Sequence, residues 1–381
     1  MHSCNPPHII PQHVGQVILA SRSTPSELTP LISLAHLLHE ITSDVLMIVP
    51  SCRPKLQAFI QNQGTTVRCY GEPSTTKHSI SSRIRDTLRF RRVFKEAIQS
   101  APAHSVAWVA GGDTAVHLPV PSIRVPWVLH LFELYDTMPI YKFLIGRQAK
   151  RAQCVVCCEP SRSDIIRTWY QLPDTPLTMP NKPHYHPRKR RSLVTDPHLQ
   201  RLTDLMDRKK TIMYQGYFGN VRDLRPFVSA VKQMGTDWLF VAMGIASPDS
   251  INEMKSISPQ FVHIPFVCPP AHLAVTSHAH IGIASYGYYM LNSIFCAPNK
   301  IWEYAGFGLP MICQNLPGLR NTVGTMQAGE CIDTSDSSAI TTALERIDAN
   351  YDTYVTASTQ MYDSIDMGTI TEIALATALS V

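Results

Sequence analysis

Strand and helix signals alternate along this chain of 381 residues, and the series begins a second time near its middle. Short apolar runs of strand length are separated by longer stretches of helix length. Connections of this kind place parallel strands side by side and cover both faces of the sheet with helices. The strands predicted in the first half are residues 16–22, 44–51, 65–71, 105–112, 125–136 and 152–161. This half is therefore expected to be Rossmann-like.

The series begins again after residues 180–192, which combine three prolines with a dense basic run and suit an exposed connection. An amphipathic helix is predicted over residues 222–234. The predicted strands of this half are residues 211–218, 237–244, 261–267, 280–286 and 309–313. The expected fold class is α/β, with two Rossmann-like, doubly wound parallel-sheet domains, and 381 residues suit two domains of ordinary size.

Composition narrows the class of protein. Hydrophobic residues at 44% and charged residues at 17% are typical of a soluble globular protein, and the net charge of +5 does not select one kind of partner. The first residues lack the pattern of a signal peptide, and no apolar run is long enough to cross a membrane. Ten cysteines are scattered, and Cys154 and Cys157 have no second ligand pair nearby, so buried reduced thiols are expected. These features predict a cytoplasmic protein.

Residues 297–312 combine a helix start, one acid and a short strand. Pro298 suits the first turn of a helix, because the N–H that proline lacks would be unpaired there. Lys300, Glu303 and Phe307 follow at spacings of three and four residues, so they share one helix face. An acid one turn into a helix that begins at the carboxyl edge of a parallel sheet points to the place where such sheets bind nucleotides. We interpret Glu303 as a carboxylate that accepts hydrogen bonds from both hydroxyls of a ribose.

This segment resembles the nucleotide-sugar-binding signature of GT-B glycosyltransferases, in particular the retaining family 4. The matching positions are Pro298, Lys300, Glu303, Tyr304, Ala305, Gly308 and Pro310. Weaker resemblance extends to residues 129–136, residues 179–181, and Gly216 with Arg222 and the helix to Met234. The resemblance implies a GT-B fold with an acceptor domain at residues 1–185, a basic connection at 186–208, a nucleotide-sugar-binding domain at 209–360, and a C-terminal helix at 361–381 that packs back on the N-terminal domain.

Glycosyl transfer expels a nucleoside diphosphate, so the protein must stabilise negative charge. The Asp-x-Asp pair that holds a metal ion in many transferases does not occur in this sequence. The resemblance implies a metal-independent enzyme without a cofactor, in which backbone amides and fixed cations stabilise the diphosphate. Lys300 and Arg222 are the predicted cations, and Gly216 and Asn299 are expected beside them. The alternatives are an ordinary surface role for Arg222 and a local ion pair between Lys300 and Glu303.

Two positions depart from the family pattern. Phe295 occupies the place of an earlier glutamate that contacts the donor sugar in many family members, and Tyr217 replaces a frequent arginine. A phenylalanine cannot accept hydrogen bonds from sugar hydroxyls. Contacts with the donor sugar are therefore expected from backbone amides or from Tyr288, Asn292 or Ser293, with a turn-forming role as the alternative for Asn292.

The predicted acceptor side has two candidate catalytic residues, His130 and Glu133, at the end of an apolar strand. An inverting transfer needs a carboxylate or an imidazole within hydrogen-bond reach of the acceptor hydroxyl. In a retaining transfer the leaving phosphate takes that proton. The alternatives are a buried strand histidine at His130 and a capping role for Glu133.

A basic helix is predicted at residues 81–100, where six cationic side chains alternate with Ile84, Leu88, Phe90 and Phe94. This pattern resembles an interfacial contact with an anionic membrane, and a solvated amphipathic helix is the alternative. No nucleic-acid-binding module accompanies the charge, so nucleic acid is not an expected partner.

Together the residues and the resemblance predict a transferase that moves a hexose from a nucleoside diphosphate sugar to a hydroxyl of a glycan or lipid-linked glycan acceptor. Retention is expected, as is a place in polysaccharide biosynthesis at the inner face of the plasma membrane. The alternatives are an isomerase resembling UDP-sugar 2-epimerases and a non-catalytic sugar-nucleotide-binding subunit.

Overall fold

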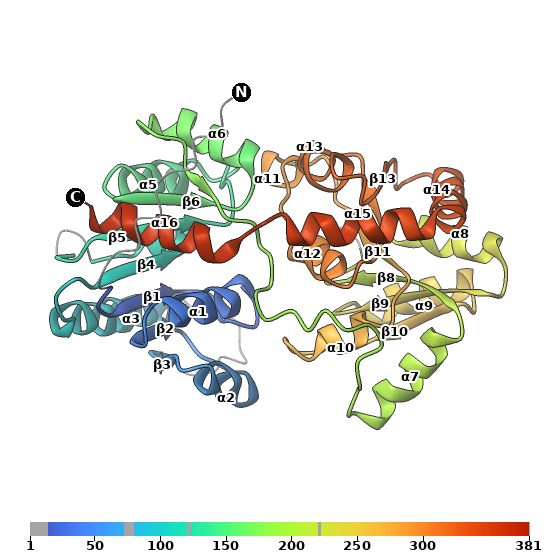
Figure 1. Cartoon of the computed structure of the whole chain (residues 1–381), viewed down its shortest axis with the longest axis horizontal. Helices are drawn as coiled ribbons and strands as arrows, with labels where there is room; N and C mark the ends of the chain where they lie inside the picture. The colour runs from blue at the N-terminus through green and yellow to red at the C-terminus, as the bar shows by residue number, and fades with distance from the viewer. Residues whose placement is uncertain (1–13, 72–79, 120–122, 220–221, 381) are drawn as a thin grey trace. The chain divides into compact units, whose positions relative to one another are not determined.

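The computed structural model describes residues 14–71, 80–119, 123–219 and 222–380. The chain divides into two compact units of α/β structure (Figure 1). Unit 1 comprises the described residues up to Pro180 and those from Asp366 onward, and unit 2 comprises Asn181–Ile365.

Unit 1 is built on a seven-stranded sheet in the order β3-β2-β1-β4-β5-β6-β7, and every pairing is parallel. Strands β1, β2, β4 and β5 are buried along their whole length, as the continuous apolar runs predict for a sheet covered on both faces. The strands are β1 Val17–Ser21, β2 Val45–Val49, β3 Thr66–Cys69, β4 Val106–Ala110, β5 Trp127–Leu131, β6 Cys154–Cys157 and β7 Leu177–Thr178, and the helices are α1 Pro30–Ile41, α2 Pro54–Asn62, α3 Ile80–Ser100, α4 Gly112–Val116, α5 Pro139–Ala149, α6 Pro160–Tyr170 and α16 Met367–Leu379.

Unit 2 is built on a six-stranded parallel sheet in the order β10-β9-β8-β11-β12-β13. Its strands are β8 Lys210–Gln215, β9 Trp238–Met243, β10 Phe261–Ile264, β11 Ile281–Ala284, β12 Met311–Gln314 and β13 Gly329–Ile332. Its helices are α7 Pro197–Asp207, α8 Arg225–Met234, α9 Pro248–Ile257, α10 His272–Thr276, α11 Leu291–Ile294, α12 Asn299–Gly306, α13 Pro317–Leu319, the π-helix η1 Arg320–Gly324, α14 Ser337–Ala349 and α15 Tyr351–Asp363.

Alternate residues of strand β8 point to opposite faces of the unit 2 sheet. Met213 belongs to the core on one face, and Ile212 and Tyr214 belong to the core on the other. Helix α12 contributes Tyr304 to the first core, and the Tyr304 hydroxyl donates a hydrogen bond to the carbonyl of Met213 at 3.1 Å. This contact holds α12 against the middle of the sheet.

The predicted fold class, two parallel-sheet α/β domains, is confirmed. The structure divides the chain at Pro180, however, and residues 186–208 are part of unit 2 rather than a separate connection. The reason is that helix α7, which Asp196 caps by accepting hydrogen bonds from the amides of His198 and Leu199, contributes Met206 to the unit 2 core. Within residues 361–381 the structure has helix α16, which belongs to unit 1, preceded by the last turn of α15 in unit 2.

The basic helix of the sequence is α3, and two of its aromatic residues are not on the surface. Phe90 and Phe94 are fully buried, whereas Ile84 and Leu88 are 57% and 60% exposed. The predicted aromatic part of a membrane contact is therefore wrong, because the unit 1 core takes up both phenylalanine rings. In the part of the chain that the structure describes, no helix is long and apolar enough to cross a membrane.

Candidate functional site

The sheet of unit 2 has a switch point between its adjacent strands β8 and β11. The chain continues outward from β8 through β9 to β10, and in the other direction from β11 through β12 to β13. In open parallel sheets ligands bind beyond the carboxyl ends of the strands at such a point. The loop after β8 begins with Gly216, and the loop after β11 contains Tyr286.

Gly216 and Gly244 allow the loop after β8 and the loop after β9 to lie in close contact. Gly216 has a φ of +122°, and its amide donates a hydrogen bond to the carbonyl of Met243 at 2.9 Å. A Cβ atom on Gly244 would lie 2.1 Å from the carbonyl oxygen of Gly216, closer than any side chain permits. The loops after β8 and β9 can therefore lie this close to each other only because residue 244 is a glycine.

Lys300 extends from the first turn of α12 to the same place. Its side chain is buried, with the residue 8% exposed, and its Nζ atom lies 4.1 Å from the ring centroid of Tyr214 and 5.4 Å from that of Tyr286. Among the described residues no atom accepts a hydrogen bond from this ammonium group. Burial lowers the pKa of Lys300 well below its ordinary value, and the positive charge of Arg222 lowers it further, while Glu303 opposes the shift.

Arg222 is the second cation of the site. Its Nη1 atom donates a hydrogen bond to the Tyr214 hydroxyl at 3.1 Å, and its guanidinium lies 4.3 Å from the ring centroid of Tyr286. The Tyr214 hydroxyl in turn donates to the carbonyl of Tyr217 at 2.8 Å. Two aromatic rings thus orient both cations, and the predicted residues Lys300, Arg222 and Gly216 meet at one point.

Glu303 lies one turn further along α12 and is 6% exposed. Its Oε1 atom lies 3.1 Å from Nε2 of His272, so the carboxylate contacts His272 rather than the lysine on the same helix. The backbone carbonyl of Glu303 lies 2.9 Å from Nε2 of His186. Burial raises the pKa of the Glu303 carboxyl, but the nearby His272, His186 and Lys300 outweigh burial, so the net pKa is lowered.

A cavity of about 600 Å³ has the second cation, Arg222, in its wall. Its walls come from the loops that follow β8, β11, β12 and β13, so it lies at the carboxyl edge of the unit 2 sheet. The Tyr288 hydroxyl donates a hydrogen bond across it to the carbonyl of Asn315. The lining residues are Arg222, Asp223, Pro226, Ser285, Tyr286, Gly287, Tyr288, Tyr289, Gln314, Asn315, Asp333, Thr334 and Ser335.

Lys300, Glu303 and Gly216 lie outside this cavity wall, and so do three of the other predicted residues. Asn292 and Ser293 are on the short helix α11, and Asn299 is the first residue of α12. All three are partly exposed, and none of them lines the cavity. Of the predicted sugar contacts, only Tyr288 does.

The sequence interpretation missed three residues that shape the site, namely Tyr214, Tyr286 and His272. Tyr214 lies two positions before Gly216, and Tyr286 lies two positions before Tyr288, so their positions in the sequence were a usable signal. His272 is the first residue of α10, and no sequence signal connects it with Glu303.

The two candidate catalytic residues of unit 1 have different surroundings. His130 lies inside β5, 2% exposed, with its ring centroid 4.1 Å from that of Phe132 and 6.0 Å from that of Trp108. Burial lowers the pKa of His130 to about 3, and neither ring nitrogen has a hydrogen-bond partner among the described residues. An imidazole enclosed in this way cannot reach an acceptor hydroxyl, which agrees with the buried-histidine alternative. Glu133 is exposed beyond the end of β5.

Comparison with known proteins finds the fold but no sequence relative. No protein-family model and no curated protein matches the chain. Among solved structures it is similar to HepE of Anabaena in complex with UDP and glucose, with 12% identity over 96% of this chain and 100% of HepE and a TM-score of 0.71. It is also similar to sucrose-phosphate synthase of Thermosynechococcus elongatus, with 15% identity over 96% of each chain and a TM-score of 0.65.

A third similar structure is a Listeria monocytogenes protein with a provisional assignment as UDP-N-acetylglucosamine 2-epimerase. The identity is 10% over 93% of each chain, and the TM-score is 0.62. Identities this low establish the fold alone. The chain has the GT-B fold, with two Rossmann-like parallel-sheet domains, as the sequence resemblance implied.

Proposed function

We propose that this protein is a glycosyltransferase that transfers a hexose from a nucleoside diphosphate sugar to a hydroxyl of a glycan or lipid-linked glycan. The observation that carries the proposal is the buried ammonium of Lys300, which lies beside Arg222 at the switch point without a hydrogen-bond acceptor among the described residues. A buried cation is costly unless an anion accompanies it. A diphosphate supplies that anion.

The chemistry of transfer explains why such a site is useful. As the bond between sugar and phosphate breaks, negative charge accumulates on the leaving diphosphate. Lys300 and Arg222 are held by packing before the reaction, so they stabilise this charge without rearranging. Charge-assisted hydrogen bonds from lysine and arginine to phosphate oxygens are among the strongest in proteins. This arrangement requires no metal ion or cofactor in the proposed mechanism.

The ribose and the sugar of the donor are assigned to residues near Lys300 and Arg222. Glu303 accepts hydrogen bonds from the ribose hydroxyls, and the lowered pKa of its carboxyl keeps it ionised for that task. The sugar is bound by the loop that contains Tyr286 and Tyr288, and its extension to Asn292 and Ser293 is the second candidate. HepE, the structure with the same fold, binds UDP and glucose. UDP-glucose is therefore the first donor to test.

On the acceptor side, Glu133 is the proposed base for an inverting transfer, because it is exposed beyond a strand end. For a retaining transfer, which the resemblance favours, the leaving phosphate accepts the proton of the acceptor hydroxyl. A Glu133→Gln variant separates the two, because only the inverting enzyme loses most of its rate, about 100-fold or more.

The test of the proposed function is a panel of UDP-, GDP- and ADP-sugars with and without glycan acceptors. Nucleotide release that depends on the acceptor supports transfer. Conversion of the sugar nucleotide without an acceptor supports the 2-epimerase alternative, and tight binding without turnover supports a non-catalytic subunit. No binding of any sugar nucleotide contradicts all three.

Peripheral membrane association is a second part of the proposal. Ile84 and Leu88 are exposed on α3, in a stretch that also presents Arg89 and Arg92 to solvent. Basic groups that flank exposed aliphatic side chains bind anionic lipid surfaces. The double variant Arg89→Gln/Arg92→Gln should lose salt-sensitive binding to vesicles that contain phosphatidylglycerol. Vesicle binding that is unchanged in the variant, or absent in the native protein, contradicts this part.

A further inference from the structure

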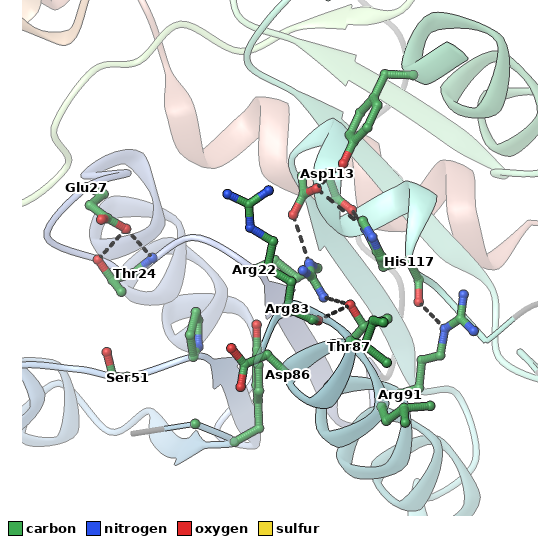
Figure 2. Close-up of a pocket in the computed structure, with 16 residues that line it drawn as sticks. Arg22, Thr24, Glu27, Ser51, Arg83, Asp86, Thr87, Arg91, Asp113 and His117 are labelled. Atoms are coloured by element: carbon green, nitrogen blue, oxygen red, sulfur yellow. Dashed lines mark hydrogen bonds and ion pairs between the residues drawn. The ribbon is translucent and has the colours of Figure 1, made fainter. Parts of the chain in front are cut away.

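Unit 1 contains a cavity of about 820 Å³ at the carboxyl edge of its own sheet (Figure 2). Arg22 follows β1, Ser51 follows β2, Tyr70 follows β3, and Asp113 lies in α4 directly after β4. Strands β1 and β4 are neighbours from which the chain continues in opposite directions, so this cavity also lies at a switch point. Helix α3 closes one side of it.

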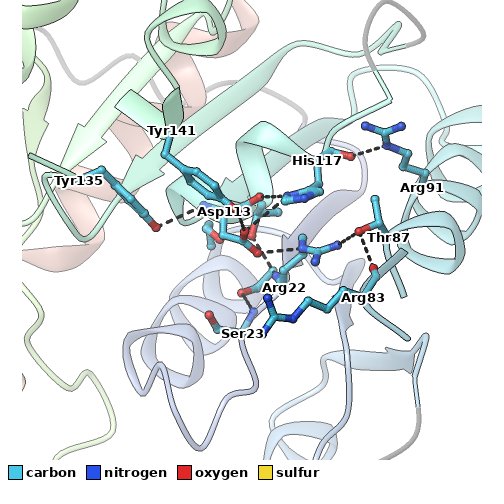
Figure 3. A network of polar contacts seen from close by, with 12 residues as sticks. Arg22, Ser23, Arg83, Thr87, Arg91, Asp113, His117, Tyr135 and Tyr141 are labelled. Atoms are coloured by element: carbon cyan, nitrogen blue, oxygen red, sulfur yellow. Dashed lines mark hydrogen bonds and ion pairs between the residues drawn. The ribbon is translucent and has the colours of Figure 1, made fainter. Parts of the chain in front are cut away.

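Arg22 is held in a fixed position at this cavity (Figure 3). Its Nε atom donates a hydrogen bond to Asp113 Oδ2 at 2.8 Å, and its Nη1 atom donates to Thr87 Oγ1 at 2.9 Å. The Tyr141 hydroxyl donates to the other oxygen of Asp113 at 3.0 Å. The Arg22 side chain is 14% exposed, so it is an ordered part of the wall and not a solvated surface chain.

Two further arginines of α3 line the same cavity. Arg91 donates from Nε to the carbonyl of His117 at 2.9 Å, and its two terminal nitrogens donate to none of the described residues. The guanidinium of Arg83 donates no hydrogen bond to any of the described residues. In Figure 2 it projects into the cavity next to Arg22. The wall thus has more hydrogen-bond donors than the chain itself uses.

The carboxylates that line the cavity do not accept hydrogen bonds from the Arg83 guanidinium or from the terminal nitrogens of Arg91. Asp113 is occupied by Arg22 and Tyr141, and Glu27 accepts hydrogen bonds from the amide and the hydroxyl of Thr24. Asp86 also has a partner within the chain. Each of these carboxylates therefore has a partner within the chain, whereas no described residue accepts a hydrogen bond from the Arg83 guanidinium or from the terminal nitrogens of Arg91.

We propose that this cavity binds the acceptor and selects an acceptor sugar that carries an oxyanion group, a phosphate ester or a carboxylate. The proposal rests on the transferase function given above and names the class of its acceptor. Arg83 and Arg91 bind the oxyanion, and Arg22, which Asp113 and Thr87 hold in place, lines the same cavity. The volume suits a sugar of one or two rings. Tyr70 and Tyr141 provide flat surfaces against which a sugar ring packs.

The test is calorimetric titration of the full chain with glucose 6-phosphate, glucuronate, glucose and inorganic phosphate. The anionic sugars should bind at least about tenfold more tightly than glucose or phosphate, since a charge-assisted hydrogen bond changes affinity by about that factor. Arg83→Gln should remove most of this preference. Arg85→Gln is the matched control, because Arg85 lies on the same helix, is exposed and does not line the cavity.

The two anionic sugars distinguish the two sources of negative charge. A preference for either over glucose supports the proposal and identifies the group. Equal binding of glucose, binding of phosphate as tight as that of the sugar phosphate, no binding of either anionic sugar, or an Arg83→Gln variant with unchanged affinity overturns it.

A titration with UDP-glucose separates this inference from the proposed function. If UDP-glucose binds and the anionic sugars fail these criteria, only the acceptor class is wrong. If the anionic sugars bind through Arg83 but no sugar nucleotide binds, the transferase function is wrong and the anion site remains. The Lys300→Met variant should keep its affinity for the anionic sugars, because Lys300 belongs to unit 2.

Discussion

The Nζ atom of Lys300 lies 4.1 Å from the ring centroid of Tyr214, although 86 positions separate the two residues (300 minus 214). The electron-rich face of the ring stabilises the ammonium group, but it supplies no hydrogen-bond acceptor. Arg222, which binds the hydroxyl of the same tyrosine, adds a second positive charge. The site therefore accumulates positive charge in a buried place, which opposes folding and favours binding of an anion.

Replacement of Lys300 by methionine should stabilise the fold and weaken donor binding. The free energy of unfolding at neutral pH is expected to rise by about 1–3 kcal/mol, because an uncompensated buried charge is removed. Affinity for a sugar nucleotide should fall about 10- to 100-fold with the loss of charged hydrogen bonds to phosphate. Thermal unfolding and calorimetry measure the two effects.

Lys210→Met is the matched control for this prediction. The Lys210 ammonium is 42% exposed and paired with Asp348 at 2.7 Å, so its removal should leave both quantities nearly unchanged. A Lys300→Met protein that binds the donor as well as the native protein contradicts the assignment of this lysine.

Replacement of Glu303 by glutamine should weaken binding of the nucleoside part of the donor. The amide keeps the shape of the side chain but loses the negative charge that strengthens hydrogen bonds from ribose hydroxyls, so affinity should fall about tenfold. Glu253→Gln serves as the control, since Glu253 is an exposed partner of Arg225. Equal affinity for UDP and its 2′,3′-dideoxy analogue in the native protein would show that this carboxylate does not bind ribose.

The lowered pKa of Glu303 predicts a pH dependence of stability. Because the folded-state pKa lies below the ordinary value of 4.5, the ionised carboxylate contributes stability above pH 4.5. This contribution disappears as the pH falls through the folded-state pKa. The difference in unfolding temperature between pH of about 6 and about 3.5 should therefore be smaller in Glu303→Gln than in the native protein. An equal or larger difference in the variant contradicts the predicted shift.

Replacement of Gly244 by alanine should disturb the end of β8. A Cβ atom at this position would lie 2.1 Å from the carbonyl oxygen of Gly216, so the backbone must move, at a cost of about 1–3 kcal/mol. Donor affinity should fall as well, because Gly216 lies next to Lys300 and Arg222. Denaturant unfolding and donor titration measure the two effects.

Gly235→Ala separates backbone strain from steric contact. Gly235 has a φ of +90°, and a Cβ atom there would meet no atom within 4 Å. This control should cost only about 1–2 kcal/mol from the left-handed backbone and should leave donor affinity unchanged. If the two alanine variants reduce affinity equally, contact with Gly216 is not the cause.

Local sequence patterns were sufficient for the fold class. The buried strands β1 and β9 appear in the sequence as apolar runs. Pro298 stands directly before α12, and Gly308 follows it. These signals depend on residues that are neighbours in the chain. Division into units was less accurate, because the proline-rich appearance of residues 186–208 did not reveal that α7 packs within unit 2.

The sequence by itself determined the two doubly wound domains and the candidates Lys300, Arg222, Gly216 and Glu303. Only the tertiary structure decided their surroundings: Tyr214 beneath Lys300, His272 as the partner of Glu303, and the enclosure of His130. The physical reason is that helix and strand periodicity arises from neighbouring residues, whereas burial, pKa shifts and hydrogen-bond partners arise from groups far apart in the chain. Those groups meet only when parallel strands align their carboxyl ends.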